Sequence, residues 1–202
     1  MIKKSFIYFS ILLVFLGIQL HAEDGLHAKG HLVSIILNAG EHLLTGKSRD
    51  GKIQFEDGAM LKVLKLDKGK IADGWDYHEH ITFLPNPYPF GGSEFYVLNI
   101  DREEFAHANL YSQPNPTSEH TQRIFHIDPL DGEIVLKTIN GVEQDWQVEK
   151  KDLEILKDWE NGDRVIIGKN SNWFATFVSE CKFIMVNCDK HRLSSYVRIK
   201  PY

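Results

Sequence analysis

The chain has 202 residues, of which 43% are apolar and 25% are charged, and its net charge is −5 at pH 7. This balance is typical of a packed globular protein, so it excludes a multi-span membrane protein and a chain that is disordered throughout. A chain of this length holds one large domain or two small ones. It contains no catalytic or cofactor motif of high specificity, and we expect no cofactor.

Residues 1–22 have the organisation of a bacterial-type secretory signal peptide. Lys3 and Lys4 form a positive start, an apolar run extends from Phe6 to Ile18, and cleavage is predicted after Ala22. A retained membrane anchor is the alternative, but about 13 apolar residues are fewer than the roughly 20 that span a bilayer. We therefore expect an exported protein that is periplasmic, envelope-associated or secreted, with no membrane span in the mature chain.

Removal of this segment makes the chain more acidic. Without Lys3 and Lys4, 21 basic residues face 28 acidic ones, which gives a net charge of −7. Binding to nucleic acid requires a basic face that contacts phosphates. We therefore expect no nucleic-acid partner.

The remaining sequence contains an internal repeat. Residues 75–86 align without a gap with residues 159–170, so that Trp75 meets Trp159. Further along, residues 95–101 align with residues 183–189, with Phe, Asn and Asp identical and apolar residues between them. Because the blocks recur in the same order, we predict a duplication.

The repeat divides the mature chain into two modules. Residues 111–122 are rich in Pro, Ser, Thr and other polar residues and have no apolar period, which is typical of a linker. We predict a first module at residues 23–110 and a second at residues 123–202.

Each module has the pattern of short β-strands. The strand-like runs are β-branched or aromatic and are bounded by Gly, Asn and Asp turns; they lie at residues 32–37, 133–139, 164–167, 182–187 and 196–199. Apart from a possible single turn at residues 151–157, no window has a sustained helical period. The sequence therefore predicts an all-β chain of two tandem small antiparallel β-barrels, since a small sheet has few other ways to bury a core.

The second module carries a Trp-x-x-Gly-Asp turn, formed by Trp159, Gly162 and Asp163, before an apolar strand. With this turn, residues 134–199 resemble the small SH3-like or OB-like β-barrel modules of uncharacterised exported bacterial proteins. The resemblance covers about a third of the chain and implies a fold and an exported setting, without an activity. The first module departs from the motif, because His78 and Glu79 stand where the second has Gly162 and Asp163.

The chain has two cysteines, Cys181 and Cys188, on either side of a strand-like run. Seven extended steps of about 3.3 Å hold their sulfurs on the order of 20 Å apart. This spacing favours two separate thiols, reduced or paired between molecules. A local disulfide is the alternative and requires a bulge or turn between them.

His78 and His80 form the most metal-like pair in the sequence, because alternate residues of a strand share a face. The alignment argues against a metal site, since it places them at the Gly162–Arg164 turn of the other module. We therefore predict surface or structural roles. A metal-dependent hydrolase centred on His78 and His80, with Glu79 as base, is the alternative function.

Two further recurring features have structural explanations. Asn and Asp at a strand end, in residues 99–101 and 187–189, favour Asx turns over a carboxylate site. Trp75 and Trp159 are predicted to pack as plugs at the ends of the barrels.

Bulky aromatic residues occur in the same inter-strand loop of both modules. The first loop carries Tyr88 and Phe90, and the second carries Trp173, Phe174 and Phe177. These residues are the predicted ligand-binding surface, for a glycan, a proline-rich peptide or another partner of the envelope. The alternative is that they fold back and close the mouth of each barrel. On this basis we expect an exported, non-catalytic binding protein.

Overall fold

A computed structural model describes residues 40–64, 67, 71, 74–86, 92–170, 179–190 and 196–202. By its internal contacts the chain divides into residues 1–37 and residues 38–202, and all described residues belong to the second of these units. The predicted signal peptide and the predicted strand at residues 32–37 lie outside the described residues.

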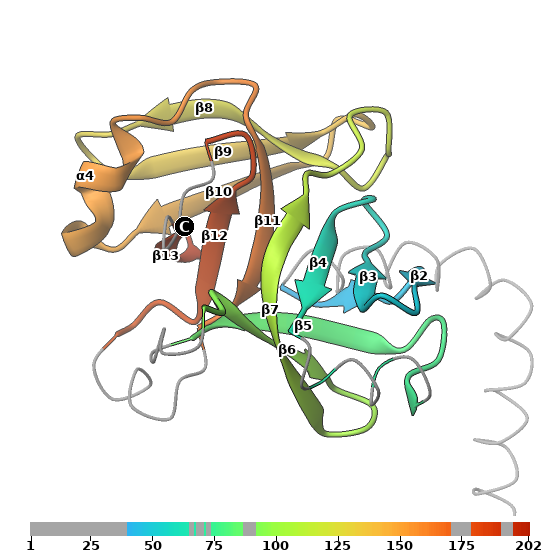
Figure 1. Ribbon diagram of the computed structural model, residues 1–202. Helices are drawn as coiled ribbons and strands as arrows, with labels where there is room; N and C mark the ends of the chain where they lie inside the picture. The colour runs from blue at the N-terminus through green and yellow to red at the C-terminus, as the bar shows by residue number, and fades with distance from the viewer. Residues whose placement is uncertain are drawn as a thin grey trace, which may run out of the picture. The chain divides into compact units, whose positions relative to one another are not determined.

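The first half of this unit forms an antiparallel sheet of seven strands in the order β1-β5-β6-β7-β4-β3-β2, which is a half-barrel and is called sheet A here (Figure 1). Its strands are β1 (His42–Leu43), β2 (Gly46–Lys47), β3 (Lys52–Gln54), β4 (Met60–Val63), β5 (His80–Pro85), β6 (Phe95–Asn99) and β7 (Glu104–Ser112).

The second half forms a closed antiparallel barrel of six strands in the order β10-β13-β12-β11-β8-β9. Its elements are β8 (Gln122–Asp128), β9 (Glu133–Thr138), β10 (Glu143–Val148), the 3-10 turn η1 (Lys150–Asp152), the short helix α4 (Leu153–Leu156), β11 (Arg164–Lys169), β12 (Phe183–Asn187) and β13 (Tyr196–Pro201). The predicted all-β class, with two antiparallel sheets in tandem, is confirmed. Within the described residues, no helix has the length and hydropathy of a membrane span.

The two sheets have the same strand order. Neighbours β5, β6, β7, β4 and β3 of sheet A correspond in turn to β11, β12, β13, β10 and β9 of the barrel. The edge strands β1 and β2 are separated by only two residues and together take the place of β8, which pairs with both β11 and β9. Sheet A therefore differs from the barrel mainly in the break between β1 and β2.

Local hydrogen bonds repeat along with the strands. Leu44 exchanges backbone hydrogen bonds with His78 and Glu79, and Ile124 does the same with Gly162 and Asp163. The turn has a positive φ in both copies, 68° at His78 and 96° at Gly162. A residue with a side chain is strained in this conformation. His78 therefore adopts the turn with some backbone strain, which Gly162 avoids.

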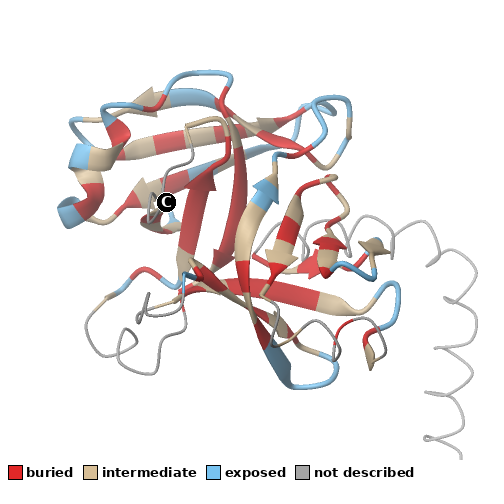
Figure 2. Cartoon of the chain, viewed as in Figure 1, coloured by how far each residue is buried: buried red, intermediate tan, exposed pale blue. Residues whose placement is uncertain are grey.

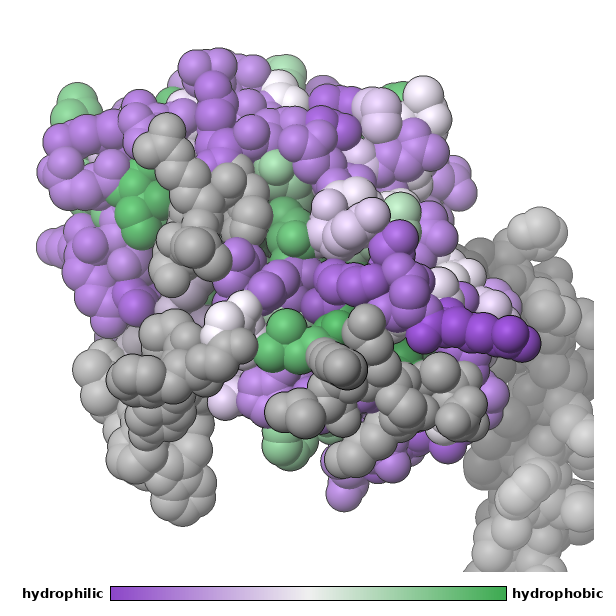
Figure 3. Space-filling view, in the orientation of Figure 1, coloured by the Kyte–Doolittle hydropathy of each residue, from purple (hydrophilic) through white to green (hydrophobic). Residues whose placement is uncertain are grey.

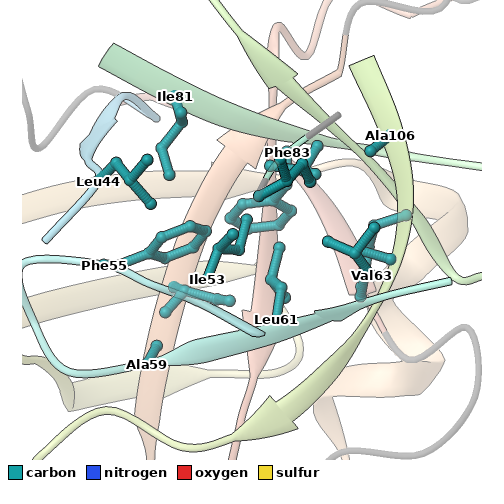
Figure 4. Packing of buried hydrophobic residues seen from close by; sticks show 14 of the residues in the cluster. Leu44, Ile53, Phe55, Ala59, Leu61, Val63, Ile81, Phe83 and Ala106 are labelled. Carbon is teal, nitrogen blue, oxygen red and sulfur yellow. The ribbon is translucent and has the colours of Figure 1, made fainter. Parts of the chain in front are cut away.

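Strands β11 and β12 are buried on both faces (Figure 2). Val165, Ile167 and Met185 face the interior of the barrel. The alternate residues Ile166, Ile184 and Val186 pack into the core of sheet A. In this core they meet side chains of sheet A that include Phe55, Leu61 and Phe83 (Figure 4). The barrel wall thus covers the open side of sheet A, and the two cores share it.

Residues 113–121, in the predicted linker, are bonded to both sheets. Asn115 N–H donates to the carbonyl of Asp57 in sheet A at 2.8 Å. On the barrel, Arg164 Nη1 donates to the carbonyl of Pro114 at 2.9 Å, and Arg123 Nη2 donates to the carbonyl of Pro116 at 3.1 Å. This segment therefore connects the sheets and also lies against them.

At Gly168 of β11 the two sheets approach each other closely. A Cβ atom at this position would lie 2.4 Å from the carbonyl oxygen of Phe83 and 2.7 Å from its ring. The obstacle includes backbone, which cannot rotate away, so a side chain at residue 168 would push β5 off the barrel wall.

We expect Gly168→Ala to lower the free energy of unfolding by about 2–4 kcal/mol, through overpacking and strand displacement. Gly74→Ala is the matched control, because a Cβ there meets nothing within 4 Å. Urea unfolding followed by tryptophan fluorescence measures both. Equal unfolding midpoints for the two variants would contradict the close contact of β5 with β11.

A buried ion pair of sheet A also bonds to the barrel. The protonated His42 ring donates from Nδ1 to Glu56 Oε1 and from Nε2 to the carbonyl of Ile167 on β11, both at 2.9 Å. Burial opposes the charge on the ring, but Glu56, together with Asp57 and the carbonyl of Ile167, outweighs burial and raises the pKa of His42 to about 9. The ring also stacks on Phe55, with centroids 4.3 Å apart.

This pKa predicts a loss of stability at alkaline pH. A folded-state pKa of about 9, above the unfolded value of 6.5, gives a stabilisation that is complete below pH 6.5 and lost as the pH rises through 9. The unfolding free energy should fall by roughly 3 kcal/mol across this window. In His42→Gln this fall should be much smaller, and unfolding curves measured from pH 6 to pH 10 compare the two. Parallel pH profiles would exclude a protonated His42.

Candidate functional site

Both aromatic loops start from the same hydrogen-bonded base. At the end of β5, Asn86 Nδ2 donates to the hydroxyl of Ser93 at 2.7 Å and to its carbonyl at 3.1 Å. At the end of β11, Asn170 Nδ2 donates to the carbonyl of Cys181 at 2.8 Å. In each case the backbone N–H of the asparagine also bonds to the next carbonyl, of Glu94 or Lys182, at 2.8 Å. We call these two arrangements the asparagine clasps.

The predicted binding residues themselves lie beyond the clasps. Tyr88 and Phe90, like Trp173, Phe174 and Phe177, are outside the described residues. The clasps nevertheless establish that the two loops leave corresponding ends of the corresponding hairpins β5–β6 and β11–β12. Whether the aromatic residues form a rim or close the barrel mouths stays a prediction.

An aromatic surface that the sequence analysis did not select lies beside the first clasp. Phe105, 56% exposed, meets Tyr96 edge to face at 5.8 Å between centroids. Tyr96 in turn lies 4.8 Å from the ring of His107. These three rings, on the outer face of β6 and β7, are called the outer aromatic cluster. The alternation of residues along a strand could have revealed this cluster. Phe95, Val97 and Ala106 are buried in the core, so the rings that alternate with them along β6 and β7 point outward.

Two polar residues hold the outer aromatic cluster and the first clasp together. Asn109 of β7 donates from Nδ2 to the carbonyl of Gly92, and its Oδ1 accepts the N–H of Glu94, both at 2.7 Å. Asp67 Oδ2 accepts both the backbone N–H and Nδ1 of His107 at 3.0 Å. Asp67 therefore fixes the position of the His107 ring, and Asn109 of β7 fixes the stem of the loop. On the face of the molecule drawn in Figure 3, hydrophilic residues predominate and hydrophobic ones show in smaller areas.

The recurring Asn-x-Asp segments form Asx turns, as predicted: Asn99 Oδ1 accepts the N–H of Arg102 at 3.1 Å, and Asn187 Oδ1 accepts those of Asp189 and Lys190 at 3.0 Å. Each segment also closes a corner of its sheet. Asp101 Oδ2 accepts the backbone N–H of His80, and Asp189 Oδ2 accepts that of Arg164, both at 2.7 Å. Asn99 Nδ2 donates to Glu79 at 2.6 Å, and Asn187 Nδ2 donates to Asp163 at 2.7 Å. These carboxylates are used to satisfy the backbone at the ends of the hairpins.

The structure places the two metal candidates in this corner of sheet A. His80 Nδ1 lies 3.2 Å from Asp101 Oδ2, and His78 occupies the positive-φ turn. Glu79 accepts hydrogen bonds from Asp76 N–H, Asn99 and Arg102, which hold its pKa below the usual range although burial acts in the opposite direction. In the part of the chain that the structure describes, no three His, Cys, Asp or Glu side chains are arranged to hold a metal ion.

The two cysteines are unbridged and buried, in agreement with the prediction of separate thiols. Burial raises the pKa of Cys181 and raises that of Cys188 well above the usual value. A thiol that stays protonated is a weak nucleophile. Trp75 and Trp159 are buried in the two cores, so they pack as predicted.

The barrel carries one further recess, on its outer surface. A groove of about 390 Å³ is lined by Arg123, Phe125, Lys137, Ile139, Asn161 and Gly162 and their neighbours. Lys137 Nζ lies 4.6 Å from the centroid of the Phe125 ring and 2.6 Å from Glu143 Oε1. Its charge is therefore compensated within the protein.

Comparison of the chain with protein-family models, curated proteins and solved structures gives no match. The resemblance to SH3-like or OB-like modules therefore stays a prediction.

We expect Asn170→Ala to lower the free energy of unfolding by about 1–3 kcal/mol, because it leaves the buried carbonyl of Cys181 without its donor. Asn161→Ala, at an exposed position, should stay within about 0.5 kcal/mol of the wild type. Chemical unfolding of the two variants side by side checks this. An Asn170→Ala midpoint equal to that of Asn161→Ala would mean that the second clasp does not hold its loop.

Proposed function

We propose that this protein is an exported, non-catalytic binding protein whose partner contacts the aromatic loops that begin at Asn86 and Asn170. The observation that carries the proposal is the pair of asparagine clasps. Each fixes both ends of a loop whose sequence is rich in aromatic residues, at corresponding places in the two sheets. A loop whose two ends are held has less conformational entropy to lose when it binds a partner.

The composition of the loops and their surroundings supports this proposal. The first loop contains Pro87 and Pro89 beside Tyr88 and Phe90, and proline restricts the backbone before binding. The outer aromatic cluster lies next to the stem of this loop. A glycan or a protein of the cell envelope, with apolar faces and hydrogen-bonding edges, suits such a surface.

The proposal includes duplication and export. A duplication is supported by the shared strand order and by the two matching corners, in which Glu79 and Asp163 play the same part. Export is supported by the sequence of residues 1–22. Two anchored copies of one loop would let the partner make two contacts with one molecule, which raises the apparent affinity when both are reached together.

The test is chemical crosslinking in envelope and culture fractions, followed by mass spectrometry of the captured material. The test variant is Tyr88→Ala, Phe90→Ala, Trp173→Ala and Phe174→Ala combined. The matched control is Phe125→Ala with Ile139→Ala, which removes exposed apolar side chains from the barrel groove. Both are compared at equal unfolding midpoints.

We expect the partner to be captured by the wild type and the control and lost with the loop variant. Capture of the same partner by the loop variant would contradict the proposal. Loss with the control alone would move the binding surface to the barrel groove.

A further inference from the structure

The hairpin turn between β9 and β10 presents an asparagine followed by a glycine. Thr138 N–H donates to the carbonyl of Val142, and Gly141 N–H donates to the carbonyl of Thr138, both at 3.0 Å. Gly141 has a φ of 81°, and so supplies the left-handed residue that closes a hairpin loop of this kind. Asn140 and Gly141 therefore stand at the tip of this hairpin.

The tip of the hairpin is open to solvent. Residues 139–142 are all exposed, and Ile139 and Val142 are 64% and 44% exposed. A Cβ atom added to Gly141 would meet nothing within 4 Å. A turn with so few contacts opens locally at a small cost in free energy.

Among the described residues, the side chain of Asn140 makes one hydrogen bond. Its Nδ2 donates to Glu119 Oε2 at 3.2 Å, and Glu119 belongs to residues 113–121, which connect the two sheets. Both residues are exposed, so water competes for this bond and the bond holds the amide only weakly. The amide group is therefore able to turn toward the backbone.

This arrangement permits a reaction within the chain. The backbone nitrogen of Gly141 gives its proton to hydroxide and attacks Cγ of Asn140, and Nδ2 takes a proton from water and leaves as ammonia. The new C–N bond closes a succinimide ring, which water then opens at either of its carbonyl carbons to give aspartate or isoaspartate. Glycine favours the attack because it has no Cβ to obstruct the approach.

The other Asn-Gly pair of the chain, Asn161–Gly162, is held more firmly. Gly162 N–H donates to the carbonyl of Ile124 at 2.7 Å, and the N–H of Ile124 donates to the carbonyl of Asp163 at 2.9 Å. The Asp163 carboxylate is itself bonded to Asn187 of β12 at 2.7 Å. Release of the Gly162 nitrogen therefore disturbs the corner of the barrel as well as the turn.

We propose that Asn140 is a site of spontaneous deamidation, which converts this residue into aspartate and isoaspartate as the protein ages. The product places a carboxylate beside Glu119, where the amide had donated a hydrogen bond. Attraction between the hairpin and residues 113–121 is then replaced by repulsion. The site lies on the β9–β10 turn and takes no part in the proposed binding function, so the two proposals are tested independently.

The test is incubation of the purified protein at mildly alkaline pH, followed over days by proteolytic digestion and mass spectrometry that distinguishes isoaspartate from aspartate. We expect conversion at Asn140 to be about five- to tenfold faster than at Asn161, where the turn opens only if a further hydrogen bond breaks. Protein unfolded in urea is the reference, and in it both pairs should convert at similar rates.

Two variants at exposed positions test the assignment. Asn140→Gln should show no conversion at residue 140 over the same period, because its longer side chain has to close a larger and less favourable ring. Asn161→Gln, at the other Asn-Gly pair, is the matched control. It should convert at Asn140 as the wild type does.

The predicted repulsion is measured with the variant Asn140→Asp. Backbone hydrogen exchange of residues 117–120, which include Glu119, should be about threefold faster than in Asn140→Gln, which keeps the amide. Addition of Glu119→Gln to Asn140→Asp removes one of the two charges and should restore the slower exchange.

Three results would overturn the proposal. One is conversion of Asn161 in the folded protein that equals or exceeds conversion of Asn140. Another is an unchanged Asn140 in the folded protein after the unfolded reference has converted. The third is exchange of residues 117–120 that does not respond to Asn140→Asp, which would exclude the repulsion between the hairpin and this segment.

Discussion

The rest of the structure depends on the wall formed by β11 and β12. One face of this wall lines the interior of the barrel and the other covers the open side of sheet A. Because each core lacks a boundary without these two strands, neither sheet buries its apolar residues alone. Gly168 permits this arrangement, since its lack of a side chain lets the backbone of Phe83 lie against β11, and the His42 ion pair bonds the two sheets at the same strand.

The repeated corners show how one backbone arrangement is kept by different side chains. A carboxylate at residue 79 or 163 and an Asn-x-Asp segment satisfy the same backbone groups in both sheets. The residue whose side chain extends outward from the corner differs between the sheets: it is His80 in sheet A and Arg164 in the barrel. The arginine is used to hold the segment between the sheets, while the histidine is left exposed.

The two aromatic loops likewise combine fixed ends with a sequence that differs between the copies. Asn86 and Asn170 anchor the loop ends at corresponding places, and the strands below them are parts of a shared core. The framework is therefore rigid where the loops begin, and the sequence between the anchors is free to differ. Loops of unequal length but similar aromatic content, on equivalent anchors, are what a binding protein with two related surfaces requires.

The sequence by itself determined the all-β class, four of the six strands of the barrel (β9, β11, β12 and β13), the Asx turns and the burial of the two tryptophans. These follow from local pattern, since the period of two, the turn residues and the recurrence of Asn-x-Asp are all read within a few neighbouring residues. It did not reveal the outer aromatic cluster, the clasps or the docking of Gln113–Pro116. The continuous apolar runs at 165–167 and 184–186 do indicate strands that are buried on both faces, because such strands do not alternate apolar with polar residues. Which surface covers them, and which donor meets the carbonyl of Pro114, depend on contacts between residues some 50 or more positions apart, so only the tertiary structure decided them.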